Sequence, residues 1–229
     1  MSILLRNPYD HSTPHSLPIS FADGSYLVVG ADGSTTVEEF LDNMSKNIDI
    51  RHSQQSDFYL FSDDPSGSKD LHILEPHRKV LDVIGWWEKT HRQQNSGRYK
   101  STKVIKLMCR KRLPLRAEPD ETAQERLLIV HQLNQDIVAL KIPLKADLAI
   151  ELASIMAQLT FGNFNHTNEP KVLEKVLDKV TCNYIASQLV REKSSLTYDV
   201  MNRWQSISGR NPQDCIRVYL NCVRRLKLD

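Results

Sequence analysis

The sequence contains no uninterrupted run of about 20 apolar residues, which is the length that a membrane-spanning helix requires. Residues 1–8 also lack the long apolar stretch behind a basic start that is typical of a secretory signal. From these two absences we expect a soluble, intracellular protein.

Cysteine is scarce, and its spacing excludes the commonest cysteine-based sites. The four cysteines are Cys109, Cys182, Cys215 and Cys222. None stands in the C-x-x-C spacing of a zinc cluster, and they do not form a disulfide framework. We interpret them as buried free thiols.

Patterns typical of several enzyme classes are missing as well. The chain has no G-x-S-x-G elbow, no glycine-rich phosphate-binding loop and no H-E-x-x-H helix. Asp63 and Asp64 are adjacent, but residues 65–67 (PSG) make this segment a turn without the further ligands of a calcium loop. We predict a protein that is not an enzyme and that holds no metal and no cofactor.

The composition is that of a folded globular protein, with 40% hydrophobic and 25% charged residues. Domains commonly contain about 100 to 150 residues, so a chain of 229 residues is long enough for two. We therefore expect two hydrophobic cores.

The first half of the chain predicts a small sheet with two helices. Apolar residues alternate in short runs, and Thr35 followed by Glu38 fits a capping box at the start of a helix. The expected strands lie at residues 17–21, 26–29, 58–61, 71–74 and 104–109. A second, short helix would carry Val80, Val83, Ile84 and Trp87 on one face. This order matches a ubiquitin-like β-grasp.

After residue 115 the apolar spacing changes from two to 3.6 residues, which indicates a helical bundle. Thr122 and Glu125 form another capping-box pattern, and Asn211 with Pro212 fits the start of the last helix. The other expected helices cover residues 144–159, 170–189 and 196–207. The fold class predicted is α+β, with an extended lead-in at 1–16, a sheet domain at 17–115 and a helical domain at 116–229.

One face of the helix after Thr122 is expected to point into the core. Its members at helical spacing are Leu127, Val130, His131, Asn134, Ile137 and Val138. A histidine on such a face is usually hydrogen-bonded inside the protein, and no second ligand lies at metal spacing. We therefore do not assign His131 to a metal site.

Several segments of the helical half resemble the middle lobe of FERM modules. They are residues 127–134 (LLIVHQLN), 143–144 (PL), 147–149 (DLA), 158–164 (QLTFGNF), and Trp204 with Cys215 and Tyr219. The resemblance implies a middle lobe with the fold of acyl-CoA-binding protein. An acyl carrier is thus one alternative function, although a shared fold does not confer that activity.

The first half resembles FERM modules that follow a myosin-tail-homology domain. The segments are residues 7–9 (NPY), 33–40 (GSTTVEEF), 61–67 (FSDDPSG) and 82–84 (DVI). Proteins of family H, which combine pleckstrin-homology, myosin-tail-homology and FERM domains, are most similar, followed by unconventional-myosin tails. Members of the family continue into a third lobe, and we expect that lobe to be absent here.

The resemblance implies an adaptor that links membrane lipids or receptor tails to the cytoskeleton. Its expected partners are phosphoinositides or receptor tails, an upstream myosin-tail-homology domain and cytoskeletal proteins. Its expected location is the cytoplasm, at the cytoskeleton or the inner face of the plasma membrane.

A basic segment, residues 89–116, contains no acidic residue although the net charge of the chain is only +2. The candidate residues for binding a lipid headgroup or an acidic partner are Lys100, Lys103, Lys106, Arg110, Lys111 and Arg112. They could instead be the solvated edge of a strand. Nucleic-acid binding is the rival function, but aromatic residues for base stacking are not interleaved with these charges.

Trp86 is the candidate protein interface. Trp87 already occupies the core face of its helix, so Trp86 falls to one side. An exposed tryptophan often marks a contact surface. The alternative is that Trp86 packs against the neighbouring lobe.

Overall fold

A computed structural model describes residues 14–94, 103–139, 141–164 and 193–226, with side chains in the last range from residue 198. The chain divides into two compact units. Unit 1 comprises Met1–Leu113 and Asp120–Leu128, and unit 2 comprises Pro114–Pro119 and Ile129–Asp229. The domain boundary expected at residue 115 stays a prediction.

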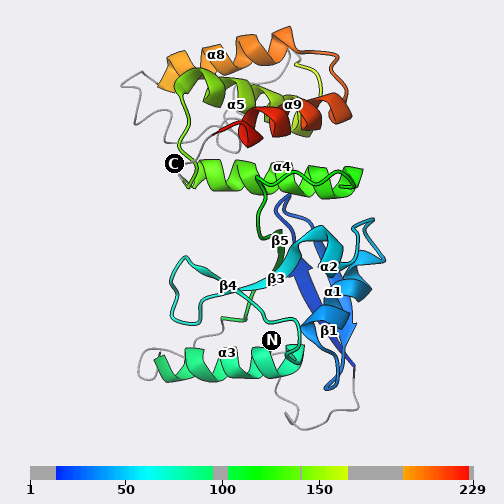
Figure 1. Ribbon diagram of the computed structural model, residues 1–229. Helices are drawn as coiled ribbons and strands as arrows, with labels where there is room; N and C mark the ends of the chain where they lie inside the picture. Colours follow the sequence, from blue (N-terminus) through cyan, green and yellow to red (C-terminus); the bar gives the residue numbers. More distant parts are fainter. Residues whose placement is uncertain (1–13, 95–102, 140, 165–192, 227–229) are drawn as a thin grey trace. The chain divides into compact units, whose positions relative to one another are not determined.

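Unit 1 is built on a five-stranded mixed sheet in the order β2-β1-β5-β3-β4 (Figure 1). The strands are β1 His15–Ser20, β2 Tyr26–Ala31, β3 Phe58–Asp63, β4 Leu71–Ile73 and β5 Leu107–Lys111. β1 pairs with β5 in parallel, and the other neighbouring pairs are antiparallel. The expected ubiquitin-like sheet, followed by helices, is confirmed.

In the described part of unit 1, three helices lie between strands of the sheet along the sequence: α1 Val37–Ser45, α2 Ser53–Ser56 and α3 Val80–Gln94. Alternation along the strands buries every second side chain, including Ile19 and Leu60. Helical spacing buries Val80, Val83, Ile84 and Trp87 on α3, as expected. α3 has 15 residues, which makes it longer than the short helix expected from the sequence.

The capping box of α1 lies one residue later than the sequence suggested. Thr36 Oγ1 accepts a hydrogen bond from the N–H of Glu39, and the Glu39 carboxylate accepts one from the N–H of Thr36. Thr35 has a different role, because its hydroxyl donates to Asp32 Oδ1 at 2.9 Å and accepts from the Asp32 N–H. The prediction for Thr35 and Glu38 was therefore wrong by one position.

Among the described residues, unit 2 contains most of α4 Ala123–Val138, together with α5 Ala146–Phe161, α8 Lys193–Ser206 and α9 Pro212–Arg224. Trp204 of α8 is buried and donates through Nε1 to the Gly162 carbonyl at 2.9 Å. The expected start of α9 is confirmed, since Asn211 accepts from the Asp214 N–H and Pro212 lies in the first turn. The helix expected at 170–189 lies outside the described residues.

The expected core face of α4 was partly wrong. Val130 and Ile137 are buried, but Leu127, His131, Asn134 and Val138 are only half-buried. Leu128, Ile129 and Leu133 are buried instead. Three consecutive buried residues, 128–130, cover more than half a turn of a 3.6-residue helix, so α4 is not amphipathic about a single stripe.

Within the described part of the chain, we find no helix that combines the length and the apolar character of a membrane span.

Candidate functional site

The basic residues expected to form one site have different environments in unit 1. Lys100 lies outside the described residues. Lys103 Nζ is 3.1 Å from Asp63 Oδ2 and 5.5 Å from the centre of the Trp87 ring. Asp63 therefore compensates part of the positive charge that the sequence concentrates in this segment.

Arg112 follows β5 and is held by two groups from other parts of unit 1. Its Nη2 lies 3.1 Å from Asp57 Oδ1, and its guanidinium carbon lies 5.0 Å from the centre of the Tyr59 ring. A guanidinium over an aromatic face is stabilised by the ring electrons. The side chain remains about half exposed, so it is ordered on the surface by its neighbours.

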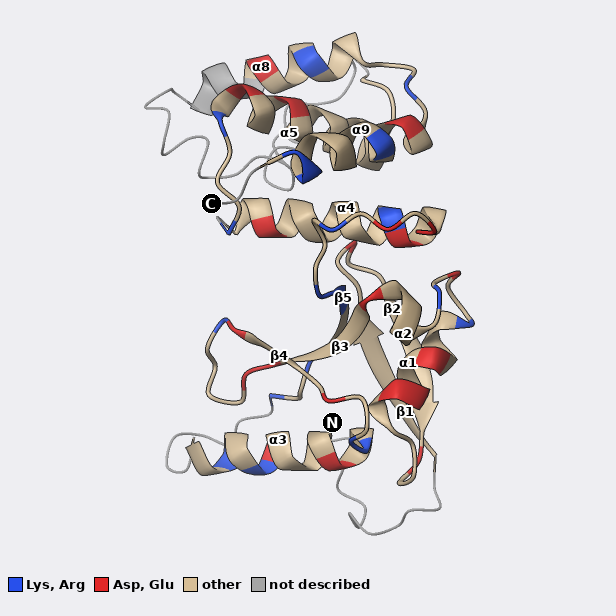
Figure 2. Cartoon of the chain, viewed as in Figure 1, with Lys and Arg blue, Asp and Glu red and all other residues tan. Residues whose placement is uncertain are grey.

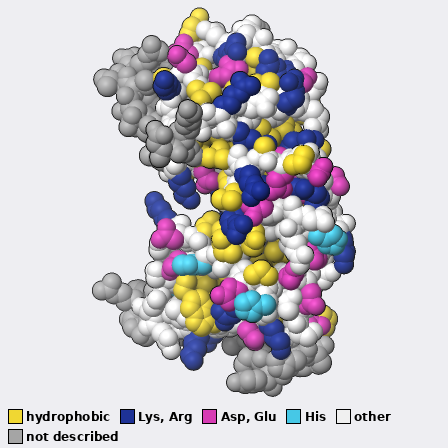
Figure 3. Space-filling model, in the orientation of Figure 1, with side chains coloured by type: hydrophobic (Ala, Val, Ile, Leu, Met, Phe, Trp, Pro, Cys, Tyr) yellow, Lys and Arg dark blue, Asp and Glu magenta, His cyan; other side chains and the backbone are white. Residues whose placement is uncertain are grey.

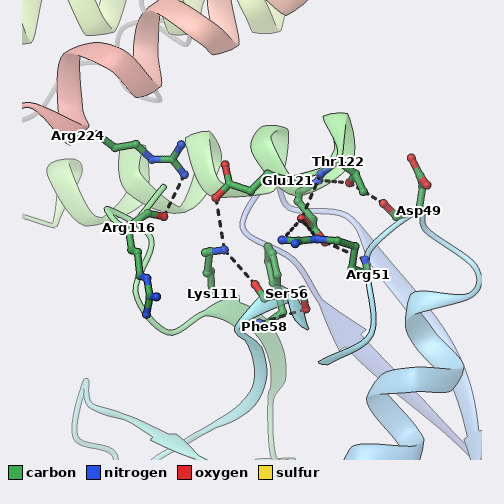
Figure 4. A network of polar contacts seen from close by, with 10 residues as sticks. Asp49, Arg51, Ser56, Phe58, Lys111, Arg116, Glu121, Thr122 and Arg224 are labelled. Carbon is green, nitrogen blue, oxygen red and sulfur yellow. Dashed lines mark hydrogen bonds and ion pairs between the residues drawn. The ribbon is translucent and has the colours of Figure 1, made fainter. Parts of the chain in front are cut away.

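Lys111 is not at the surface, which corrects its assignment to a binding patch. The residue is 1% exposed, and its Nζ lies 3.4 Å from Glu121 Oε1 and 3.0 Å from the Ser56 carbonyl (Figure 4). Leu107, Cys109 and Lys111 share the inward face of β5. The period of two that buries Leu107 and Cys109 therefore also carried the signal for Lys111.

A second polar contact joins the start of α4 to a loop of unit 1 (Figure 4). Arg51 donates to Glu125 from its backbone N–H at 2.8 Å and from its guanidinium, with Nη2 2.9 Å from Oε2. Thr122 donates to the Asp49 carbonyl at 2.7 Å. The expected capping box of Thr122 and Glu125 is confirmed, but its contact with Arg51 has no local signal, because 74 residues separate the two.

The outward face of the sheet has a continuous cross-strand row of mostly apolar residues. Direct partners in the ladder give the order Tyr26, Ser20, Met108, Phe61 and Ile73, one from each strand. Tyr26 and Ile73 are 71% and 44% exposed, and Met108 and Phe61 are half-buried. This row was missed from the sequence, because its members come from five separate segments.

Two of the predicted basic residues flank this row, Arg110 on β5 and Lys106 directly before that strand. Lys106 and Arg110 stand two residues before and after Met108 and share its outward side, since Leu107 and Cys109 point inward. Lys106 is exposed and Arg110 is half-buried. The structure thus places these two cations about 7 Å from Met108 along the strand, one on each side.

Trp86 is exposed as expected, at 53%, whereas its neighbour Trp87 is fully buried. Trp87 donates through Nε1 to the Asp63 carbonyl at 2.7 Å and stacks on His91 at a centroid distance of 5.0 Å. Its core role is therefore settled. That Trp86 contacts a partner stays a prediction.

Asp64 belongs to a turn. Its Oδ2 lies 2.6 Å from His72 Nε2, and its Oδ1 accepts from the N–H of Ser66. Hydrogen bonds from Ser66 and His72 lower the pKa of Asp64 to about 2. Among the described residues, no group of three or more His, Cys, Asp or Glu side chains is placed to hold a metal ion.

Two family matches follow one another along the chain. Residues 13–113 match the RA like domain, and residues 119–228 match the FERM central domain. The chain contains FERM-type domains. These FERM-type domains account for the order of a ubiquitin-like sheet followed by helices.

A protein of Drosophila melanogaster, whose name records it only as uncharacterized, is 39% identical over 98% of this chain. The chain spans 12% of the length of that protein. The FERM-type domains described here therefore correspond to a small part of the relative.

Solved FERM structures share the fold at low sequence identity. Human Myosin 7b C-terminal MyTH4-FERM domain in complex with harmonin-a PDZ3 domain is 12% identical, with a TM-score of 0.71 over 93% of this chain and 42% of that chain. The FERM and C-terminal domain complex of Drosophila Merlin is 15% identical, with a TM-score of 0.66 over 92% of this chain and 65% of that chain.

Proposed function

We propose that these FERM-type domains form a non-enzymatic adaptor that links membrane lipids or receptor tails to the cytoskeleton. One observation carries this proposal: an RA like match and a FERM central match follow one another over residues 13–113 and 119–228. Two of the similar solved structures are FERM modules in complexes, one with harmonin-a PDZ3 and one with the Merlin C-terminal domain. Both are consistent with an interaction module.

The finer assignment is a member of the family H proteins, in which an upstream myosin-tail-homology domain precedes the FERM module. The resemblance of residues 33–40 and 61–67 supports it, as do the matches to MyTH4-FERM structures. In this arrangement the module acts at the cytoskeleton or the inner face of the plasma membrane.

Phosphoinositide contact would use the surface cations of unit 1. Lys106 is exposed, Arg110 is half-buried, and Lys103 and Arg112 lie at the surface beside their carboxylate partners. Each cation near an anionic membrane contributes about 1 kcal/mol at low screening. Lys111 is not included, because it is buried.

Vesicle co-sedimentation tests the lipid arm. We expect binding to phosphatidylcholine vesicles that contain phosphatidylinositol bisphosphate, and a loss of about tenfold or more in Lys106→Glu/Arg110→Glu. The matched control is Lys69→Glu/Lys79→Glu, which makes the same charge change at exposed residues elsewhere in unit 1. An equal loss in both variants, or equal binding to phosphatidylserine vesicles of the same charge, would argue against a specific headgroup site.

A pull-down tests the adaptor arm. The chain is compared alone and fused behind a myosin-tail-homology domain, with receptor-tail peptides and cytoskeletal extract as prey. We expect the FERM-type domains alone to capture receptor-tail or cytoskeletal prey, and the fusion with the upstream domain to capture more of it. No capture by either form, together with no lipid binding, would refute the adaptor proposal.

A further inference from the structure

We propose that the outward face of β5 and its neighbours docks an extended protein segment of the pattern acidic-x-apolar-x-acidic. The proposal rests on the proposed function only in assuming that the FERM-type domains bind partners. It adds the chemistry of the partner and the place where it lies.

Period two on β5 defines the pattern. Met108 and Arg110 stand on the same side of β5, and Lys106, one residue before the strand begins, continues this alternation, with about 7 Å from each residue to the next. An extended segment that runs along β5 also presents every second side chain to the sheet, at the same spacing. A carboxylate, an apolar side chain and a second carboxylate would then meet a cation, Met108 and a second cation.

The apolar row gives the centre of the segment a surface to cover. Met108 has Phe61 beside it on β3 and Ser20 on β1, with Tyr26 and Ile73 at the two ends. Adjacent strands are about 4.8 Å apart, so the row spans about 19 Å. Tyr26 and Val28 add exposed apolar surface on β2, at 71% and 53%.

The charge on this face favours an acidic partner. β1 (HSLPIS) and β2 (YLVVGA) carry no Lys, Arg, Asp or Glu and are tan in Figure 2. The nearby carboxylate of Asp63 accepts from the Lys106 N–H and pairs with Lys103, and Asp57 pairs with Arg112. Figure 3 shows hydrophobic side chains next to Lys and Arg side chains over the part of the sheet where Figure 1 labels β3 and β5.

A protein segment suits this combination better than a headgroup or a nucleic acid. Phosphates would contact Lys106 and Arg110 but would leave the apolar row uncovered. A chain that places an apolar side chain between two anions satisfies both parts of the surface. Burial of Met108 against the apolar side chain of the segment contributes affinity, and the two cations contribute the register and specificity of binding.

The test uses fluorescein-labelled peptides and fluorescence anisotropy with the full chain. The probe is Gly-Asp-Ser-Leu-Ser-Asp-Gly, and its comparison peptides are Gly-Ser-Asp-Leu-Asp-Ser-Gly and Gly-Asp-Ser-Ser-Ser-Asp-Gly. We expect the first peptide to bind at least about tenfold more tightly than either of the others, and more weakly as salt rises. Equal binding of all three would overturn the pattern.

Reversing the charges on both partners gives the decisive experiment. The variant Lys106→Glu/Arg110→Glu should no longer bind the acidic probe and should bind the basic peptide Gly-Lys-Ser-Leu-Ser-Lys-Gly instead. The control variant Lys69→Glu/Lys79→Glu should keep the peptide preference of the parent. Binding of anionic vesicles is not restored by the double Glu variant, so binding of the basic peptide by that variant identifies a protein contact. If the variant does not bind the basic peptide, the assignment of Lys106 and Arg110 as the partners of the carboxylates is wrong.

The row is tested at its centre, where the segment crosses it. Met108→Ser should weaken the probe about tenfold, and Tyr198→Ser, at a residue 64% exposed in α8, should not. Loss of phosphatidylinositol bisphosphate vesicle binding in Met108→Ser with peptide binding intact would instead assign this face to a membrane. No peptide binding up to about 1 mM, with vesicle or partner binding retained, would end this inference and leave the proposed function standing.

Discussion

Lys111 Nζ lies 3.4 Å from Glu121 Oε1, and both side chains are almost completely buried. The Ser56 carbonyl accepts from the same ammonium at 3.0 Å, and Phe58 lies beside it with its ring centre 5.8 Å away. A charge in this position is stable only while its partners are present. This pair therefore ties the end of β5 to the segment just before α4, both within unit 1.

Removing one member of the pair should be worse than removing both. We expect Lys111→Met to lower the free energy of unfolding by about 3 kcal/mol, because Glu121 is left buried without its cation. Lys111→Met/Glu121→Leu should recover most of that loss. Urea unfolding followed by circular dichroism measures both, with Lys106→Met as the exposed control. A double variant as unstable as the single one would contradict the ion-pair explanation.

The two adjacent tryptophans should behave differently on truncation. Trp87→Ala removes a fully buried ring and its hydrogen bond to the Asp63 carbonyl, so we expect a loss of about 3 to 5 kcal/mol. Trp86→Ala should change stability by less than about 0.5 kcal/mol, because the side chain is half exposed. Thermal unfolding of the two variants gives the comparison, and similar losses would show that Trp86 packs inside the protein.

The ionised carboxylate of Asp32 should stabilise the folded protein at neutral pH but not in strong acid. Hydrogen bonds from Ser34 and Thr35 lower its pKa to about 2 from 3.8. A lowered pKa in the folded state means that the stabilisation is present above about pH 4 and is lost as the pH falls to about 2. Asp32→Asn should therefore be less stable than the parent at pH 6, and the difference should shrink at pH 2. A difference that stays constant between pH 6 and pH 2, measured by urea unfolding, would exclude this role for the carboxylate.

Cys109 should resist thiol reagents in the folded protein. Burial raises its pKa to about 12, and the residue lies on the inward face of β5. Cys222 is only half-buried, although burial also raises its pKa. With iodoacetamide at pH 8 and peptide mapping by mass spectrometry, we expect Cys222 to be labelled before Cys109. Labelling of Cys109 at the rate seen in urea would show that β5 opens readily.

Local spacing predicted most elements of the structure. The strands of unit 1, the face of α3 and the caps at Thr122 and Asn211 all depend on residues within four positions of one another. The cap of α1 was misplaced because Thr35 and Thr36 are chemically equivalent. The turn at Asp32 engages the first of them and leaves the second for the helix.

By itself the sequence determined the period of each segment, and hence a sheet followed by helices with an exposed Trp86 beside a buried Trp87. Only the tertiary structure decided which basic residues remain at the surface. A run of like charges in sequence says nothing about carboxylates that arrive from elsewhere, such as Asp63 beside Lys103 and Glu121 beside Lys111. The cross-strand row from Tyr26 to Ile73 likewise exists only after strand pairing sets the register.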